Sequence, residues 1–266
     1  MRIGTWNCRL NIDSKRSALD SLALDLAVVP ESAQHPTLAS EPGVTHQWTG
    51  RNPNKGLGVF AFAPWTITPI YEPDPYPWCL PVSAQHPNGT CMTVLAVWTV
   101  KNTGDQRPSY AGQLEAVIER WRDTIEHQPA IIAGDLNASF QGPSLEPHRR
   151  NIDTLEAMGT RSAFQLANGP VGPDDEPATL RWIGPGKKPY LYHCDYIFVS
   201  ALLAGSVMTA QVGSLTDWVE TKLSDHCPVL VELDDAQLVA PANDLIQERK
   251  RRESQHHETT HAPKSP

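Results

Sequence analysis

The sequence predicts an α/β protein in which two packed mixed β-sheets are flanked by helices, a four-layer α/β sandwich. Two observations favour this class. Runs rich in β-branched and aromatic residues recur along the chain without an internal repeat, and segments with apolar residues at helical spacing stand between them. At 266 residues and 40% hydrophobic content, the chain is also long enough to bury a substantial core.

The N-terminal segment predicts a strand, a helix and a second strand. "RIGTW" has the composition of a strand, and "LAVVPES" is a second strand that ends near Glu31. Between them we expect a helix capped by Asp13 or Ser14. Its apolar positions, at helical spacing, are Leu19, Leu22, Ala23 and Leu26.

The middle and C-terminal segments alternate between sheet and helix. "HPNGT" predicts a hairpin turn before a long strand, and one further helix is expected around residues 114–125 from an apolar stripe. Positions Leu114, Val117, Ile118, Trp121 and Ile125 form that stripe. The expected strands are "GLGVFAF", "WTITPIY", "TCMTVLAVWTV", "AIIAGDLN", "LYHCDYIFVS", "SVMTAQV" and "CPVLVEL".

Composition narrows the class of function. The chain has no run of about 18 apolar residues and no apolar leader, so we expect a cytoplasmic protein without a membrane span. Five widely spaced cysteines without a CxxC motif favour reduced thiols. The net charge of −8 excludes the broad basic field of a duplex-coating protein, so any nucleic acid would be bound locally.

Ligand-type side chains recur where apolar strands end. Such a set of carboxylates and amides suits a hard cation such as Mg²⁺, whereas zinc would prefer more histidine or cysteine. Asp135 and Asn137 of "GDLN" would share one face of a strand by side-chain alternation, although an Asp-x-Asn is also ordinary turn chemistry. The residues in question are Asn7, Glu31, Asp135, Asn137, Asp195, Asp225 and His226.

The motifs that carry these residues, taken in their order along the chain, resemble those of the endonuclease/exonuclease/phosphatase superfamily, which has the deoxyribonuclease-I-like fold. The resemblance covers Met1 to about Leu233, and it is strongest for the small bacterial members. Its marks are "TWN", a strand ending in Glu31, "NKGLGVF", "GDLN", "DYIF" and "SDH".

The resemblance implies a metal site and a substrate class. Glu31 would bind Mg²⁺, for which Mn²⁺ could substitute, and Asn7 and Asp225 would complete or support the metal shell. The substrate would be a phosphodiester, with nucleic acid, and DNA in particular, favoured.

The same resemblance implies roles for four catalytic residues. Asp135 would orient and deprotonate the attacking water, and Asn137 would hold the phosphate or the water. His226 would donate to the phosphoryl oxygens, and Asp195 would fix its tautomer and favour its charged form. The reaction would be metal-assisted in-line phosphoryl transfer.

The chain departs from the family after the strand that precedes the long helix, where many members carry Asn or His and this chain has "AVWTV". The proton donor to the leaving group is therefore unassigned. Tyr110 could supply a phenol or could simply pack at a helix start. His193 stands where many relatives have Arg, as a weak phosphate contact or a plain strand residue. Thr179 and Arg181 complete the expected substrate contacts.

We therefore expect a catalytic domain over residues 1–233 and a polar tail over 234–266. Two rivals stay open: a phosphatase or phosphodiesterase for a small or lipid phosphate, and a catalytically silent binding module on the same scaffold. "HETTH" at 257–261 matches a zinc-protease pattern, but it stands in a polar, His-rich tract, so we interpret it as a chance match.

Overall fold

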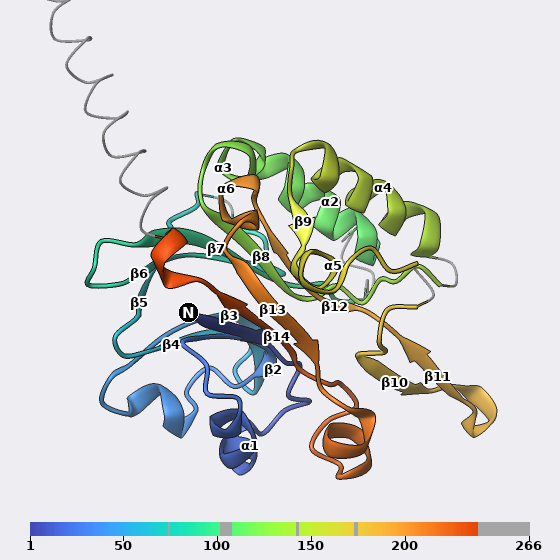
Figure 1. Cartoon of the computed structure of the whole chain (residues 1–266). Coiled ribbons are helices and arrows are strands. Elements are labelled where there is room, and N and C mark those ends of the chain that lie inside the picture. Colours follow the sequence, from blue (N-terminus) through green and yellow to red (C-terminus); the bar gives the residue numbers. More distant parts are fainter. Residues whose placement is uncertain (74, 102–107, 142–143, 173–174, 239–266) are drawn as a thin grey trace, which may run out of the picture.

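The computed structural model describes residues 1–73, 75–101, 108–141, 144–172 and 175–238, and these include two six-stranded sheets (Figure 1). Each sheet includes a parallel pair among antiparallel neighbours, so both are mixed. Across the first sheet the strands are β13 (Val207–Val212), β14 (Val229–Leu233), β1 (Arg2–Thr5), β2 (Leu26–Ser32), β4 (Lys55–Phe62) and β3 (Val44–Asn52). Across the second they are β5 (Thr66–Pro69), β6 (Cys79–Gln85), β7 (Cys91–Trp98), β8 (Ala130–Asp135), β12 (Asp195–Val199) and β9 (Arg161–Ser162).

The main core lies between the two sheets and is made of aliphatic side chains from both. Strand residues of the first sheet, such as Ile3 and Val28, and of the second, such as Val94 and Ile131, are completely buried there. Branched aliphatic side chains pack well on such a pleated, two-sided surface, which is why these runs form strands.

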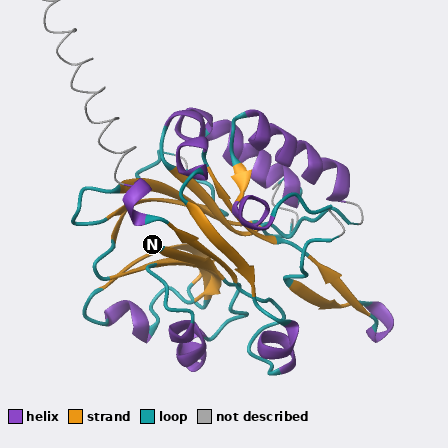
Figure 2. Ribbon diagram, in the orientation of Figure 1, coloured by secondary structure: helices purple, strands orange, loops and turns teal. Residues whose placement is uncertain are grey.

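Helices cover the outer face of each sheet (Figure 2). A second apolar cluster joins the second sheet to helices above it, and a third joins the first sheet to short helices below it. The predicted four-layer α/β sandwich is therefore confirmed. The upper helices are α2 (Tyr110–Arg120), α3 (Arg122–His127) and α4 (Leu145–Ala157); the lower ones are α1 (Arg16–Ser21), two 3-10 turns (Ile12–Lys15 and Thr37–Ser40) and a π-helix (Thr216–Glu220); α5 (Ala163–Asn168) and α6 (Ala201–Ala204) contact β12.

Several element boundaries differ from those expected. Leu26 begins β2 instead of ending the first helix, and neither Asp13 nor Ser14 caps that helix. The helical stripe is split at Trp121, whose φ of −103° leaves the helical region, into α2 and α3. Helix α4 and strands β3 and β6 were not predicted, whereas the "HPNGT" turn is confirmed between β6 and β7.

The segment expected to be one strand, "LYHCDYIFVS", forms parts of two. β11 (Pro189–Tyr192) pairs with β10 (Leu180–Ile183) in a separate hairpin, and β12 starts only at Asp195. This hairpin, with a 3-10 turn (Pro185–Lys187) at its tip, projects from the right of the body in Figure 1. The break at residues 193–194 directs the hairpin away from the second sheet.

Packing continues past the predicted boundary at Leu233. Leu238 is 2% exposed within the core between the sheets, and the Asp235 carboxylate lies 2.6 Å from the N-terminal amine of Met1. The packed body therefore reaches at least Leu238. The rest of the expected tail, "HETTH" included, lies outside the described residues. Among the helices described, none is long and apolar enough to cross a membrane.

Candidate active site

The residues predicted at strand ends meet at one edge of the sandwich. Asp135 and Asp195 end and begin neighbouring strands of the second sheet, where they are register partners. From the first sheet, the Asn7 amide donates to Asp135 Oδ2 at 2.9 Å. Asn7 follows β1 of the first sheet and Asp135 ends β8 of the second, so this hydrogen bond places the polar group where the two sheets meet.

A backbone turn, and not strand alternation, brings Asn137 beside Asp135. β8 ends at Asp135, and Asn137 adopts a left-handed φ of 45°. Its backbone N–H donates to Asp135 Oδ1 at 2.9 Å, and its side-chain amide donates to Asp135 Oδ2 at 3.0 Å and to the Thr99 carbonyl at 2.9 Å. The turn interpretation of Asp-x-Asn is thus correct, while the shared strand face is wrong.

Gly134 allows β8 to pass close to β7 at this point. Its φ of 146° lies outside the range that L-residues favour, and a Cβ there would come within 1.8 Å of the Val97 carbonyl oxygen. Only glycine therefore fits before Asp135.

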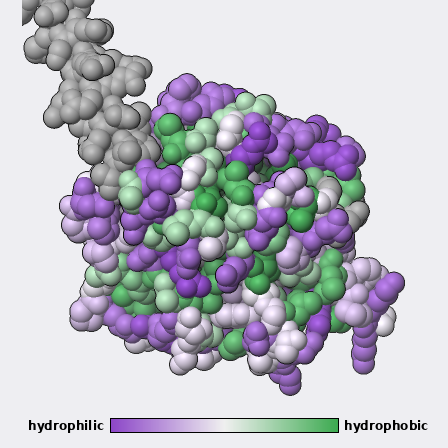
Figure 3. Space-filling model, viewed as in Figure 1, coloured by the Kyte–Doolittle hydropathy of each residue, from purple (hydrophilic) through white to green (hydrophobic). Residues whose placement is uncertain are grey.

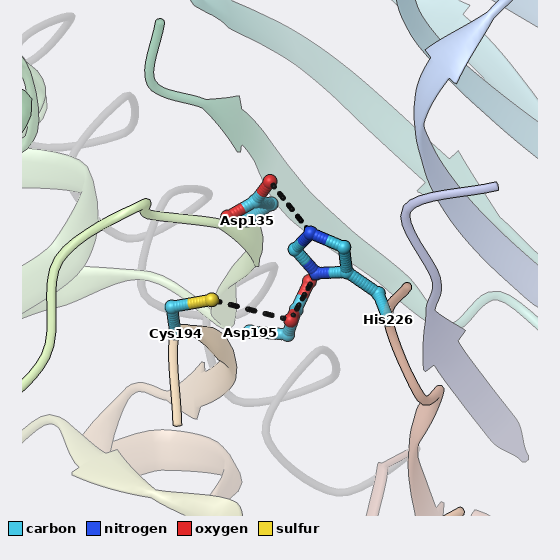
Figure 4. A group of neighbouring side chains, drawn as sticks. All are labelled: Asp135, Cys194, Asp195 and His226. Carbon is cyan, nitrogen blue, oxygen red and sulfur yellow. Dashed lines mark hydrogen bonds and ion pairs between the residues drawn. The ribbon is translucent and has the colours of Figure 1, made fainter. Parts of the chain in front are cut away.

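His226 lies between two buried carboxylates (Figure 4). Its Nδ1 is 2.8 Å from Asp195 Oδ2, and its Nε2 is 4.0 Å from Asp135 Oδ2. Burial alone lowers the pKa of His226, but Asp195 and Asp135 outweigh this effect and raise the pKa to about 10. The imidazole is therefore a cation at neutral pH, with Nδ1–H donated to Asp195.

Asp135 is completely buried, and this burial raises its pKa to about 7. The charge of Asp195 adds to the increase, whereas His226 and the hydrogen bond from Asn7 oppose it. A carboxylate with a pKa near neutrality is suited to accept a proton during a reaction.

The group Asp135, Cys194, Asp195 and His226 has ligand-type atoms that all lie within 4.8 Å of one another, close enough to hold a metal ion. Its chemistry fits a hard cation poorly. Burial raises the pKa of the Cys194 thiol well above its usual range, so it is not the thiolate that binds metals, and the protonated His226 has no free nitrogen lone pair at neutral pH.

Glu31 forms a second, oxygen-rich group beside the first. A bulge in β2 and a φ of 61° place Glu31 out of the regular ladder, and its Oε1 lies 3.5 Å from the Asn7 amide nitrogen. The Lys55 ammonium lies 3.2 Å from Glu31 Oε2. A carboxylate that already attracts a cation fits Mg²⁺ better than the thiol-containing group does, and the Asn7 amide that donates to it helps to position it.

Asp225 lies at the margin of this region. Its side chain is 33% exposed and its carboxylate lies 3.7 Å from Arg9 Nε. The neighbouring Ser224 hydroxyl donates to the Asn7 carbonyl at 2.7 Å, which fixes the loop carrying Asp225 and His226 to the end of β1.

Of the four expected substrate contacts, Tyr110 alone lines the cavity next to the site. This cavity, of about 440 Å³, also has walls from Asn137, Leu180, Trp182 and Tyr192. Burial raises the pKa of the Tyr110 phenol, and the charge of Asp135 adds to the increase.

The other three lie elsewhere. Thr179 is fully buried, and its Oγ1 accepts from the backbone N–H of Asp195 at 3.1 Å, so it positions that residue. His193 is buried with Nδ1 2.6 Å from the Pro177 carbonyl and lies 4.0 Å from Glu176. Arg181 pairs with Glu220 at 3.2 Å.

Sequence reasoning missed the aromatic residues of the cavity and the hairpin. Tyr190 and Tyr192 stand at alternate positions in "KKPYLYH", and Trp182 is in "LRWIG". The period-two spacing of the two tyrosines was the available signal for a shared strand face, and the hairpin register places Trp182 on the same face.

The two-sheet α/β sandwich is the deoxyribonuclease-I-like fold that the motifs implied. No family model and no curated protein matches the sequence. Solved structures that match are the 3′ phosphatase NExo from Neisseria bound to product DNA hairpin (17% identity, 88% of this chain and 99% of that chain, TM-score 0.62) and an AP endonuclease from Archaeoglobus fulgidus (14%, 88% and 99%, TM-score 0.64). The AP endonuclease LMAP from Leishmania major also matches (14%, 88% and 87%, TM-score 0.64). At these identities the match shows a shared fold.

Proposed function

We propose that the protein is a divalent-cation-dependent phosphodiester hydrolase that acts on nucleic acid, with DNA favoured. The observation that carries this proposal is the buried Asp135, which faces a protonated His226 across 4.0 Å and is hydrogen-bonded to Asn137, a residue that lines the cavity. A phosphodiester needs a base for the attacking water and a cation for the charge that develops on its oxygens, and these two side chains supply both.

Three hydrogen bonds, two from side chains and one from the backbone, hold Asp135 in place for proton transfer. Asn7 and Asn137 donate to the same oxygen, Oδ2, and the Asn137 backbone donates to Oδ1. The carboxylate is thus fixed before substrate binds, and its raised pKa makes it a stronger proton acceptor than an exposed aspartate.

His226 would donate from Nε2 to a phosphoryl oxygen, where negative charge increases in the transition state. Asp195 accepts the Nδ1 proton, which fixes the ring, and Thr179 holds the backbone of Asp195. The Tyr110 phenol, kept protonated by its raised pKa, could donate to the leaving oxygen, since Trp98 stands where the resembled family often has Asn or His.

Glu31, with Asn7 and Asp225 in support, would hold Mg²⁺ or Mn²⁺. When bound, the cation would neutralise phosphate charge and polarise the phosphorus centre. The preference for DNA draws support from the Neisseria structure, which is bound to a product DNA hairpin.

A phosphatase or phosphodiesterase for a small or lipid phosphate is the second candidate, because a net charge of −8 disfavours binding of a polyanionic nucleic acid. Asp135 lies 4.0 Å from His226 and shares the Asn7 amide with Glu31, and this set of side chains argues against a silent binding module.

The test is a side-by-side panel of plasmid, single-stranded DNA, RNA, bis(p-nitrophenyl) phosphate and a phosphate monoester. Chelated protein is supplied with Mg²⁺, Mn²⁺ or Zn²⁺. We expect DNA cleavage with Mg²⁺ or Mn²⁺ and not with Zn²⁺ alone. Turnover of monoesters only would favour the second candidate, and no turnover with any cation would favour the binding module.

A further inference from the structure

The hairpin of β10 and β11 carries a row of aromatic side chains on one face. Trp182 and Tyr190 are register partners with ring centroids 5.5 Å apart, and Tyr190 stacks on Tyr192 at 6.4 Å with an interplanar angle of 11°. Trp182 is 45% exposed and Tyr190 is 36% exposed. In Figure 3 the hairpin projects from the right side of the body. Large aromatic rings held in this way on a projecting element are available to a ligand.

The aromatic row is connected directly to the catalytic loop. Leu180 forms an isolated antiparallel bridge with His226, and the Arg181 backbone N–H donates to the Asp225 carbonyl at 2.9 Å. Trp182 and Tyr192 line the same cavity as Asn137. A ligand on the aromatic face therefore continues into the candidate active site.

Positive charge accompanies this row. Lys188 Nζ lies 5.5 Å from the centre of the Tyr190 ring, and Lys187 precedes it at the hairpin turn. Arg181 points from the opposite face, where it pairs with Glu220. In a chain with net charge −8, two lysines beside three aromatic rings complement a ligand that combines flat bases with phosphates.

We propose that the face formed by Trp182, Tyr190 and Tyr192 binds the unpaired bases of a single strand next to the scissile phosphate. The proposal rests on the proposed nuclease function and names a single-stranded segment as its substrate. Stacked bases of a duplex present only their edges, whereas unpaired bases expose the faces that aromatic side chains can cover.

The test measures binding by fluorescence anisotropy in EDTA, so that no strand is cleaved. The probes are a thymidine strand of about 12 nucleotides, within the range of known single-strand sites, an abasic strand with the same phosphates, and a duplex. We expect Trp182→Ala and Tyr190→Ala each to weaken thymidine-strand binding by about 5-fold or more. Tyr71→Ala is the matched control, because Tyr71 is 88% exposed beside the edge strand β5 and should not matter.

Equal binding of the thymidine and abasic strands would overturn the proposal, as would tighter binding of the duplex. Unchanged affinity in normally folded Trp182 and Tyr190 variants would also overturn the proposal. So would the finding that the wild-type protein is a dimer and that these variants are monomers, because the face would then bind a second copy of the chain. If either variant fails to melt like wild type, Lys188→Glu serves instead, and it should weaken binding and its dependence on salt.

Wild-type hydrolysis of the thymidine strand with Mg²⁺ is measured separately. Base-dependent binding without hydrolysis would support the aromatic face and overturn the nuclease function. Hydrolysis with base-independent binding would do the reverse.

Discussion

Replacing Asp135 by asparagine should sharply lower turnover and, above pH 7, leave the fold as stable as before or more stable. The side chain is completely buried, and its burial raises the pKa from 3.8 to about 7. Because the folded protein then binds a proton more tightly than the unfolded chain does, stability decreases as the pH rises from about 4 to 7. At higher pH the ionised Asp135 costs the fold about 4 kcal/mol, at about 1.4 kcal/mol per pKa unit.

An asparagine removes this cost and loses hydrogen bonds instead. Asp135 accepts three hydrogen bonds, but an asparagine side chain has only one oxygen. One donor, such as the Asn137 backbone N–H, would then face the NH2 of the asparagine and have no acceptor. Leaving such a donor unsatisfied costs about 1–3 kcal/mol. The difference predicts a variant that is about 1–3 kcal/mol more stable than wild type above pH 7. At pH 4, where wild-type Asp135 is protonated and has no charge to remove, the variant should be about 1–3 kcal/mol less stable.

The assay combines thermal melts in EDTA at both pH values with turnover at saturating Mg²⁺. Loss of the general base should lower turnover by about 100-fold or more, without recovery at high Mg²⁺. Asp153→Asn, an exposed substitution of the same kind on α4, is the control and should change neither quantity. An Asp135→Asn protein with near-normal turnover, or one that melts well below wild type above pH 7, would refute the reasoning.

Three further predictions concern metal binding, acid stability and the C-terminal boundary. Glu31→Gln should raise the Mg²⁺ concentration for half-maximal turnover at least about tenfold, and its activity should recover at high Mg²⁺, in contrast to Asp135→Asn. A loss of turnover that does not depend on the Mg²⁺ concentration would show that Glu31 is not in the metal site. His148 is fully buried, and burial lowers its pKa to about 4, so the unfolded state binds its proton first and the fold loses up to about 3 kcal/mol as the pH falls from 6.5 to 4. In denaturant titrations across this range, His148→Gln should flatten the loss and the exposed His127→Gln should not; equal slopes would contradict this. A chain that ends after residue 233 should melt below one that ends after 238, because it loses the buried Leu238 side chain, worth about 2 kcal/mol; equal melting temperatures would show that this contact contributes nothing.

The fold class followed from the sequence because its causes are local. Branched aliphatic runs such as "TCMTVLAVW" and "AIIAGD" cannot form amphipathic helices and are long enough to cross a sheet, so their number and composition already indicated two packed sheets. The chemistry at strand ends was readable for the same reason. Asp135 and Asp195 stand immediately beside apolar strands in the sequence, and they are register partners in the structure.

Errors arose where a contact far along the chain overrides the local pattern. Leu26 continues a helical spacing, yet it pairs with Ile3 and Ala61 in the first sheet and therefore begins a strand. The predicted strand through "LYHCDYIFVS" divides because Thr179 Oγ1 accepts the backbone N–H groups of Cys194 and Asp195, which interrupts the ladder. The residue types at those positions do not by themselves indicate a strand or hydrogen-bond partner so far away in the sequence.

The sequence by itself determined the apolar strands, the ligand-type residues that end them and therefore the kind of chemistry available. Tertiary structure alone decided that Asp135 shares its environment with His226 from a loop 91 residues later, since the distance between residue numbers says nothing about distance in space. It also decided their charges, because burial and neighbouring carboxylates set pKa values only after the sheets have packed. Tertiary structure also decided that the aromatic face is exposed. Trp182 and Tyr190 would be ordinary core residues if β10 and β11 had joined the second sheet.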